Sequence, residues 1–156
     1  MSTPRGPYLT AALLCERVIQ EKDNVKSIMR IIDQVIQTGH PAQGREPPPD
    51  LVPFQYEISM FTGFKRGQAA QGEHHVEIVF VSASGARTRL IENRFRFTSD
   101  DPGEGLDMIG QLSVRIERTG LHWFEVHLNG TLITRAPLRV IYRREVATPV
   151  GDPETT

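Results

Sequence analysis

The feature that most constrains the fold is an alternation of apolar and polar residues that recurs between Pro53 and Arg144. A half-buried strand needs this period of two, because successive side chains point to opposite faces of a sheet. An amphipathic helix repeats about every 3.6 residues instead. We therefore predict an all-β domain, with strands in the runs 54–60, 76–81, 94–97, 112–116, 122–128, 131–135 and 138–142.

Turn residues separate these runs. Asn129-Gly130 lies between two β-like runs and favours a type I′ hairpin, because both central residues of that turn take positive φ. Gly85 predicts a second turn within residues 82–86, and the segment 99–105 consists of turn-forming residues. Each pair of neighbouring strands in this part of the chain is thus expected to be antiparallel.

Prolines and polar residues mark the domain limits. The segment Thr38 to Pro53 contains prolines and glycines that continue neither a helix nor a central strand, so we predict a long surface crossover. Residues 1–7 are predicted to be a flexible N-terminus, and residues 148–156 a disordered tail. One β-domain is expected between them, over residues 8–147.

The opening segment is ambiguous from its pattern alone. Apolar residues from Ala11 to Val35 recur at steps of three and four, as on one face of a helix. Against a helix, the segment is rich in Val and Ile, and Asp23-Asn24 suits a hairpin turn. The residues leave both a helix and a β-hairpin open for 8–37.

A resemblance favours the hairpin. The segment AALLCERVIQEKDNVKSIMRIID, residues 11–33, resembles the opening hairpin of a family of small bacterial proteins catalogued only as a domain of unknown function. The segment GLHWFEVHLNGTLI, residues 120–133, with PLRV at 137–140, is similar to the closing hairpin of that family. The resemblance implies an antiparallel immunoglobulin-like β-sandwich of about eight or nine strands in a bacterial cytoplasmic protein. It brings no catalytic residues with it.

Charge and cysteine content exclude some classes of function. The 18 Lys and Arg residues against 19 Asp and Glu residues give a net charge of -1. Such a balanced chain has no overall field that attracts nucleic acid or anionic lipid, so nucleic acid is an unlikely partner. No apolar stretch approaches the roughly 20 residues of a membrane span. The single cysteine, Cys15, excludes an intramolecular disulfide and favours the cytoplasm.

Histidines and an acidic loop are the candidate metal ligands of the chain. His74 and His75 are expected on opposite faces of a strand, as are His122 and His127. The chain has no cysteine pair and no His-x-x-x-His spacing, so we predict no metal site. The carboxylates of the acidic loop suit Ca²⁺, but their spacing is not that of an EF-hand, and calcium binding stays open. These carboxylates are Asp100, Asp101, Glu104 and Asp107.

No catalytic motif is present. The sequence has no Gly-x-Ser-x-Gly, no phosphate-binding loop and no Gly-x-Gly-x-x-Gly. Cys15 lies among Leu13, Leu14 and Val18, so we expect a buried thiol rather than a nucleophile. We predict that the protein is not an enzyme and uses no cofactor.

The candidate partner-binding residues are Trp123 and four arginines. Arg87 with Arg89, and Arg94 with Arg96, alternate along one β segment and are expected to line an exposed sheet face. They are paired there with neighbouring acids, or they bind an acidic protein or phosphates. If Phe124 is in the core, Trp123 points outward, where it either anchors a partner or is covered by the proline-rich crossover.

The function expected from these observations is a non-catalytic intracellular protein-binding module, such as an adaptor, inhibitor or accessory subunit of a regulatory or defence system. A nucleic-acid-binding module that uses the arginine face is one alternative, and an enzyme with a cryptic site around His122 or His127 is another.

Overall fold

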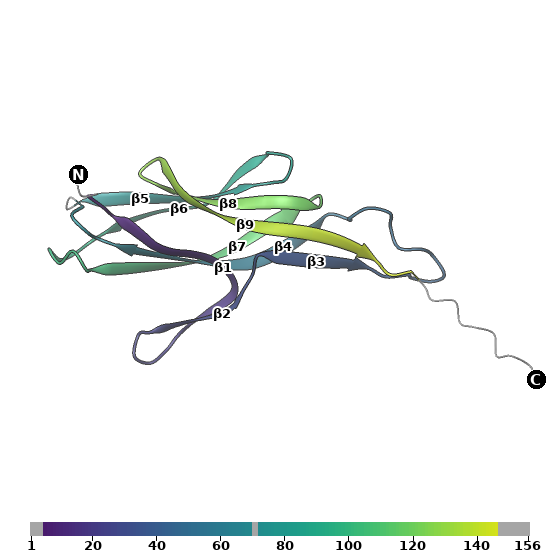
Figure 1. Cartoon of the computed structure of the whole chain (residues 1–156), viewed down its shortest axis with the longest axis horizontal. Helices are drawn as coiled ribbons and strands as arrows, with labels where there is room; N and C mark the ends of the chain where they lie inside the picture. Colours follow the sequence, from purple (N-terminus) through teal and green to yellow (C-terminus); the bar gives the residue numbers. More distant parts are fainter. Residues whose placement is uncertain (1–4, 70–71, 147–156) are drawn as a thin grey trace, which may run out of the picture.

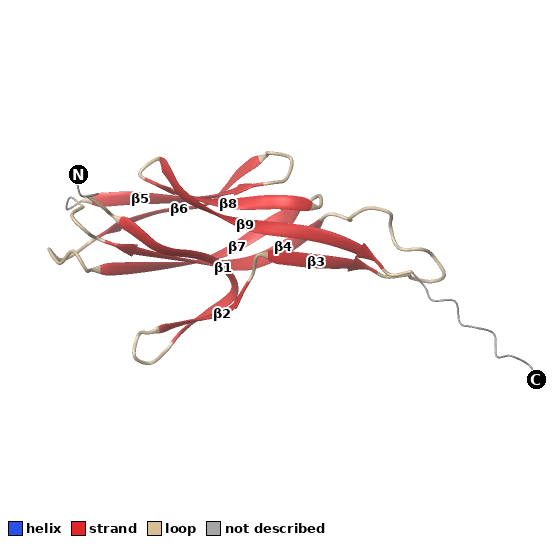
Figure 2. Ribbon diagram, in the orientation of Figure 1, coloured by secondary structure: helices blue, strands red, loops and turns tan. Residues whose placement is uncertain are grey.

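Nine β-strands in two sheets form the part of the chain that the structure, a computed structural model, describes: residues 5–69 and 72–146 (Figures 1 and 2). Sheet A has the strand order β2-β1-β4-β7, and sheet B the order β3-β9-β8-β5-β6. No helix occurs in these ranges, so none is long and apolar enough to cross a membrane. The strands are β1 (Tyr8–Gln20), β2 (Lys26–Ile31), β3 (Gln34–Gly39), β4 (Phe54–Lys65), β5 (Glu73–Val81), β6 (Arg87–Arg96), β7 (Gly105–Ile116), β8 (Gly120–Leu128) and β9 (Thr131–Arg144).

The prediction of an all-β chain is confirmed, but the sheets are not wholly antiparallel. β3 runs parallel to β9, from Gln34 opposite Arg139 to Gly39 opposite Arg144. The chain reaches β3 by crossing between the sheets: the Ile32 amide donates to the Leu14 carbonyl of sheet A, and the Asp33 carbonyl accepts from the Arg139 amide of sheet B. β3 therefore begins next to the middle of β9 and follows it in the same direction.

The opening segment forms a hairpin, as the resemblance to the family implies. The helix that the steps of three and four favoured is not present. β1 pairs antiparallel with β2, and Asn24 takes φ 65° in the turn between them. The first half of β1, up to Cys15, pairs with β4 along its other edge. β1 pairs with β2 only from Cys15 onward, where the part of β1 that pairs with β4 ends. The hairpin therefore extends away from the rest of sheet A, as Figure 1 shows.

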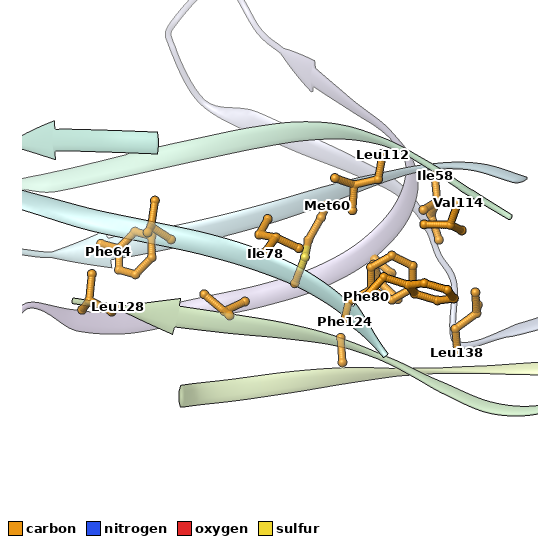
Figure 3. Packing of buried hydrophobic residues seen from close by; sticks show 14 of the residues in the cluster. Ile58, Met60, Phe64, Ile78, Phe80, Leu112, Val114, Phe124, Leu128 and Leu138 are labelled. Atoms are coloured by element: carbon orange, nitrogen blue, oxygen red, sulfur yellow. The ribbon is translucent and has the colours of Figure 1, made fainter. Parts of the chain in front are cut away.

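The core lies between the two sheets (Figure 3). Alternate residues of β8 point into it, with Phe124 and Val126 fully buried, which confirms the predicted period of two. The ring of Phe124 packs against that of Phe80 on the neighbouring strand, with centroids 5.1 Å apart. Sheet A contributes Met60 and, among others, Leu112 to the same cluster.

The predicted turns are present. Asn129 and Gly130 have φ of 51° and 81°, as a type I′ turn requires. Residues between β3 and β4 form the predicted crossover, which is attached to β9 because the Tyr142 hydroxyl donates to the Pro48 carbonyl at 2.8 Å. The predicted tail, 148–156, and residues 1–4 of the predicted flexible N-terminus lie outside the described residues.

Candidate functional site

The outward face of sheet B carries the candidate partner-binding residues. On β5, the residues that alternate with buried Val76 and Ile78 point outward, and they pair with outward residues of β6 and β8. We call this surface the charged face. It consists of Glu73, His75, Glu77, Arg87, Arg89, Glu92, Arg94, Arg96, Trp123, Glu125, His127 and Arg135.

All four predicted arginines lie on this face. Arg94 is opposite His75, and Arg89 is opposite Val79, although Arg89 and Arg94 are an odd number of residues apart. A register shift between Ile78 and Val79 makes this possible, because one extra residue in β6 reverses its alternation. The sequence indicated each arginine pair separately; the bulge that aligns the two pairs has no local sequence signal.

Acidic neighbours neutralise three of these arginines. Arg87 binds Glu125, and Arg94 binds Glu73 at 3.1 Å. The guanidinium of Arg89 lies 3.6 Å from the Glu77 carboxylate and 2.6 Å from the Glu92 carboxylate. These are the acidic pairings that the sequence left open. Within the described ranges, Arg96 has no acid within ion-pair distance.

The ion pairs change the acidity of the charged face. Hydrogen bonds from Arg87 and then from His127 hold the pKa of Glu125 below its ordinary value, although its burial acts in the opposite sense. The pKa of Glu92 is lowered by hydrogen bonds from His75 and Arg89. Both carboxylates therefore remain ionised at neutral pH, and the face carries negative and positive side chains side by side.

Trp123 points outward, since Phe124 is in the core. Its indole is only partly exposed, because the guanidinium of Arg135 lies 4.1 Å from the ring centroid. The proline-rich crossover is attached elsewhere, at Tyr142 and Arg144 near the end of β9. Arg135, and not the crossover, is thus the neighbour that stacks on Trp123; its role as a partner contact stays a prediction.

The histidines divide between the two faces as predicted. His74 and His122 are buried, whereas His75 and His127 lie on the charged face. His75, Glu77 and Glu92 bring their ligand atoms within 4.8 Å of one another. Sequence reasoning missed this group because it treated His74-His75 as a pair, and because Glu92 joins it from a different strand. The His75-x-Glu77 spacing was the visible part of the signal.

A cavity of about 230 Å³ reaches His122. The backbone holds both nitrogens of the ring: Nδ1 accepts a hydrogen bond from the Ala83 amide at 3.0 Å, and Nε2 donates to the Arg118 carbonyl at 3.1 Å. Burial lowers the pKa of His122. This histidine is fixed as a neutral ring, with no nitrogen left to accept a proton from a ligand.

The acidic loop uses its carboxylates within the chain. Glu104 accepts hydrogen bonds from the amides and hydroxyls of Thr98 and Ser99, which lower its pKa to about 2. Asp101 accepts from the Gly103 amide at 2.8 Å. Asp107 lies on β7 and binds Lys26 of β2 at 2.7 Å. Glu104, Asp101 and Asp107, three of the four candidate Ca²⁺ ligands, thus each bind a different partner within the chain.

The β1–β2 hairpin exposes apolar side chains that sequence reasoning did not single out. Val25, Met29 and Ile31 are 59%, 41% and 64% exposed. At the other edge of sheet A, Ile109 of β7 is 42% exposed. Cys15, at the base of the hairpin, is buried as predicted, and burial raises the pKa of its thiol. The exposed residues went unnoticed because the helix and hairpin alternatives assign them to different faces.

Comparison with known proteins places the chain in one family. It belongs to a family of unknown function (DUF6941), which matches residues 10–141. No curated protein matches the chain.

Two solved structures are similar to the chain at low sequence identity. One is the Pseudomonas fluorescens alkylpurine DNA glycosylase AlkC bound to DNA containing an abasic site analog, with 11% identity and a TM-score of 0.44. That match covers 83% of this chain but only 30% of the glycosylase chain. The other is a putative lipoprotein from Bacillus anthracis, with 12% identity, a TM-score of 0.33 and coverage of 81% and 84% of the two chains.

Proposed function

We propose that this member of the DUF6941 family is a non-catalytic protein-binding module, an adaptor, inhibitor or accessory subunit of a larger bacterial cytoplasmic assembly. The observation that carries the proposal is the β1–β2 hairpin, which extends away from the rest of sheet A (Figure 1). Its Val25, Met29 and Ile31 side chains are exposed. We also propose that its two facing sheets are an immunoglobulin-like sandwich. The Asn129-Gly130 hairpin between β8 and β9 supports that classification.

The hairpin is suited to a protein partner for two reasons. Burial of a fully exposed side chain of this size contributes about 1.5–3 kcal/mol. Val25, Met29 and Ile31 are 59%, 41% and 64% exposed, so a partner that covers them gains roughly half of that figure for each. In addition, β2 is an edge of sheet A, so its free backbone groups are available to an added strand. Exposed Met29 and Ile31 lie on this edge strand, next to the backbone that such a partner would pair with.

The charged face is the second proposed contact region, with Trp123 as its aromatic anchor. Tryptophan and arginine are enriched among the residues that dominate binding energies. The same face does not favour nucleic acid, because Arg87, Arg89 and Arg94 already have carboxylate partners. A protein gains free energy from binding nucleic acid when Lys and Arg side chains that have no acidic partner neutralise phosphates and displace the counterions around them.

The test is affinity capture from a bacterial lysate with a nuclease-treated control, followed by mass spectrometry. We expect a stoichiometric protein partner that survives nuclease and is lost with Ile31→Glu. Leu132→Glu is the matched control, because Leu132 is 47% exposed on β9 and the change introduces the same charge. A partner retained by Ile31→Glu, or recovery of nucleic acid instead, would contradict the proposal.

Trp123→Ala tests the second region. We expect it to weaken partner binding while the melting temperature changes little, because Trp123 lies outside the core cluster. A large fall in melting temperature would show that Trp123 serves stability instead.

A further inference from the structure

One group of side chains on the charged face has a metal-binding chemistry that a protein contact alone does not use. His75 and Glu77 of β5 and Glu92 of β6 place one ligand atom each within 4.8 Å of the others. A His75 nitrogen is 3.5 Å from the Glu77 carboxylate, and its other nitrogen is 2.8 Å from the Glu92 carboxylate. One imidazole and two carboxylates thus converge from adjacent strands.

The strands hold this group in place. His75 and Glu77 are two residues apart on β5 and share a face, and Glu92 lies directly opposite Glu77. The His75 backbone is fixed by Asn129. The Asn129 side-chain oxygen accepts from the His75 backbone amide at 2.9 Å, and the Asn129 backbone amide donates to the His75 carbonyl at 2.7 Å. A metal ion would meet donors whose backbone positions are already set.

Two carboxylates directly opposite each other repel and destabilise a strand pair. The register nevertheless places Glu77 opposite Glu92, with their two side chains 26% and 44% exposed. Arg89 compensates from one side, at 3.6 Å and 2.6 Å, and His75 bridges from the other. A divalent cation compensates the same pair more fully, because it carries two charges into the space between the donors.

We propose that His75, Glu77 and Glu92 bind a divalent transition-metal ion with zinc-like preferences. Zinc accepts imidazole nitrogen and carboxylate oxygen at about 2.0–2.2 Å, and three protein ligands leave its fourth position for water. The imidazole favours zinc over magnesium and calcium, which select oxygen donors. Side-chain rotation on the fixed strands closes the remaining distance.

Arg89 is the internal competitor of the metal in this arrangement. Its guanidinium binds both carboxylates that the ion needs, so it must withdraw when the ion enters. This gives the site a signature that nonspecific zinc binding lacks: loss of one positive side chain strengthens binding much more than loss of another on the same face.

The experiment is calorimetric titration of the full, untagged chain with Zn²⁺, repeated with Mg²⁺ and Ca²⁺. We expect one Zn²⁺ per chain and no heat from the other two ions. His75→Gln and Glu92→Gln are expected to weaken zinc binding by at least about tenfold, because loss of even an outer-shell partner of a metal site lowers affinity by about 10–100-fold. Arg89→Gln is expected to tighten it.

Two variants serve as controls. Arg94→Gln removes an equal charge from the same face. Arg94 lies opposite His75, but among the described residues its ion pair is with Glu73 and not with Glu77 or Glu92, so the change should alter zinc affinity much less than Arg89→Gln. His40→Gln removes a distant histidine that pairs with Glu145, and it should have no effect.

Two results would overturn the site. One is the absence of stoichiometric zinc binding by the parent chain. The other is zinc binding that survives His75→Gln or Glu92→Gln in a chain whose circular dichroism shows the parent fold, since the zinc then lies elsewhere.

Discussion

At the scale of single residues, Asn129 performs three structural functions at once. Its φ of 51° satisfies the turn between β8 and β9. Its side-chain oxygen accepts from the His75 amide, and its side-chain amide lies 3.2 Å from Nδ1 of His74. One residue thus fixes the β8–β9 hairpin and the start of the neighbouring strand β5.

Replacing Asn129 separates these contributions. We expect Asn129→Gly to lower the free energy of unfolding by about 1–2 kcal/mol through the lost hydrogen bonds. Asn129→Ala should cost about 1 kcal/mol more, because alanine adds strain at positive φ that glycine avoids. Urea denaturation of the two variants measures the difference. Equal stabilities would contradict the role assigned to φ.

His122 provides a pH dependence of stability whose sign follows from its environment. Burial lowers its pKa in the folded chain below the ordinary value near 6.5. As the pH falls below that value, the unfolded chain takes up the proton more readily than the folded chain does. Stability is therefore fully present above the unfolded pKa and decreases as the pH falls toward the folded pKa, by at most about 1.4 kcal/mol per pH unit.

The variant His122→Phe tests this prediction. It keeps an aromatic ring beside Phe80, with which His122 stacks at 5.5 Å, and removes the titrating group. We expect its unfolding free energy to change less between pH 7.5 and 5.5 than that of the parent chain, whatever its absolute stability. An unchanged slope would assign the pH dependence to other groups.

At the scale of elements, strands that alternate cleanly were predictable and pairings distant in sequence were not. β7 and β8 follow the period of two closely, with buried residues at every second position from Gly110 to Ile116 and from His122 to Leu128. The Asn129-Gly130 turn was visible because its φ requirements select few residue types. These signals lie within short stretches of the chain, so they can be recognised from the sequence alone.

β1 shows why the opening segment resisted prediction. Its pairing with β4 shifts register between Leu9 and Ala11, which breaks the period of two. From Cys15 onward it pairs with β2 instead, and its environment changes again. A strand with a bulge and two successive partners leaves an apolar pattern that also fits a helical period.

The outward placement of the four arginines and of Trp123 was predictable from the sequence, but the grouping of His75, Glu77 and Glu92 was not. The period of two along a strand put Arg87 and Arg89 on the same face. It also put Trp123 on the outward face, because the adjacent Phe124 points into the core. The group of His75, Glu77 and Glu92 depends on the β5–β6 register, which in turn depends on the bulge near Val79. One inserted residue decides which side chains converge, and no local composition reports it.

At the scale of the whole molecule, β9 connects parts of the chain that are far apart in sequence. It pairs with β8 along one edge and, through residues Arg139 to Arg144, with β3 along the other. Tyr142 and Arg144 also hold the crossover through the carbonyls of Pro48 and Pro47. The crossover that follows β3 in the sequence is thus held by β9, the last strand along the chain.

This arrangement predicts a sharp limit to C-terminal truncation. A chain that ends at residue 146 keeps every β9 contact among the described residues, so we expect its melting temperature to match that of the full chain within about 2 °C. A chain that ends at residue 138 loses the partner of β3 and the buried side chain of Val140. Burial of that side chain contributes about 1.5 kcal/mol or more, and the lost β3 pairing adds to the deficit. We expect the shorter chain to unfold at lower temperature and to be cut by protease within residues 34–53; resistance there would show that β3 and the crossover are held without β9.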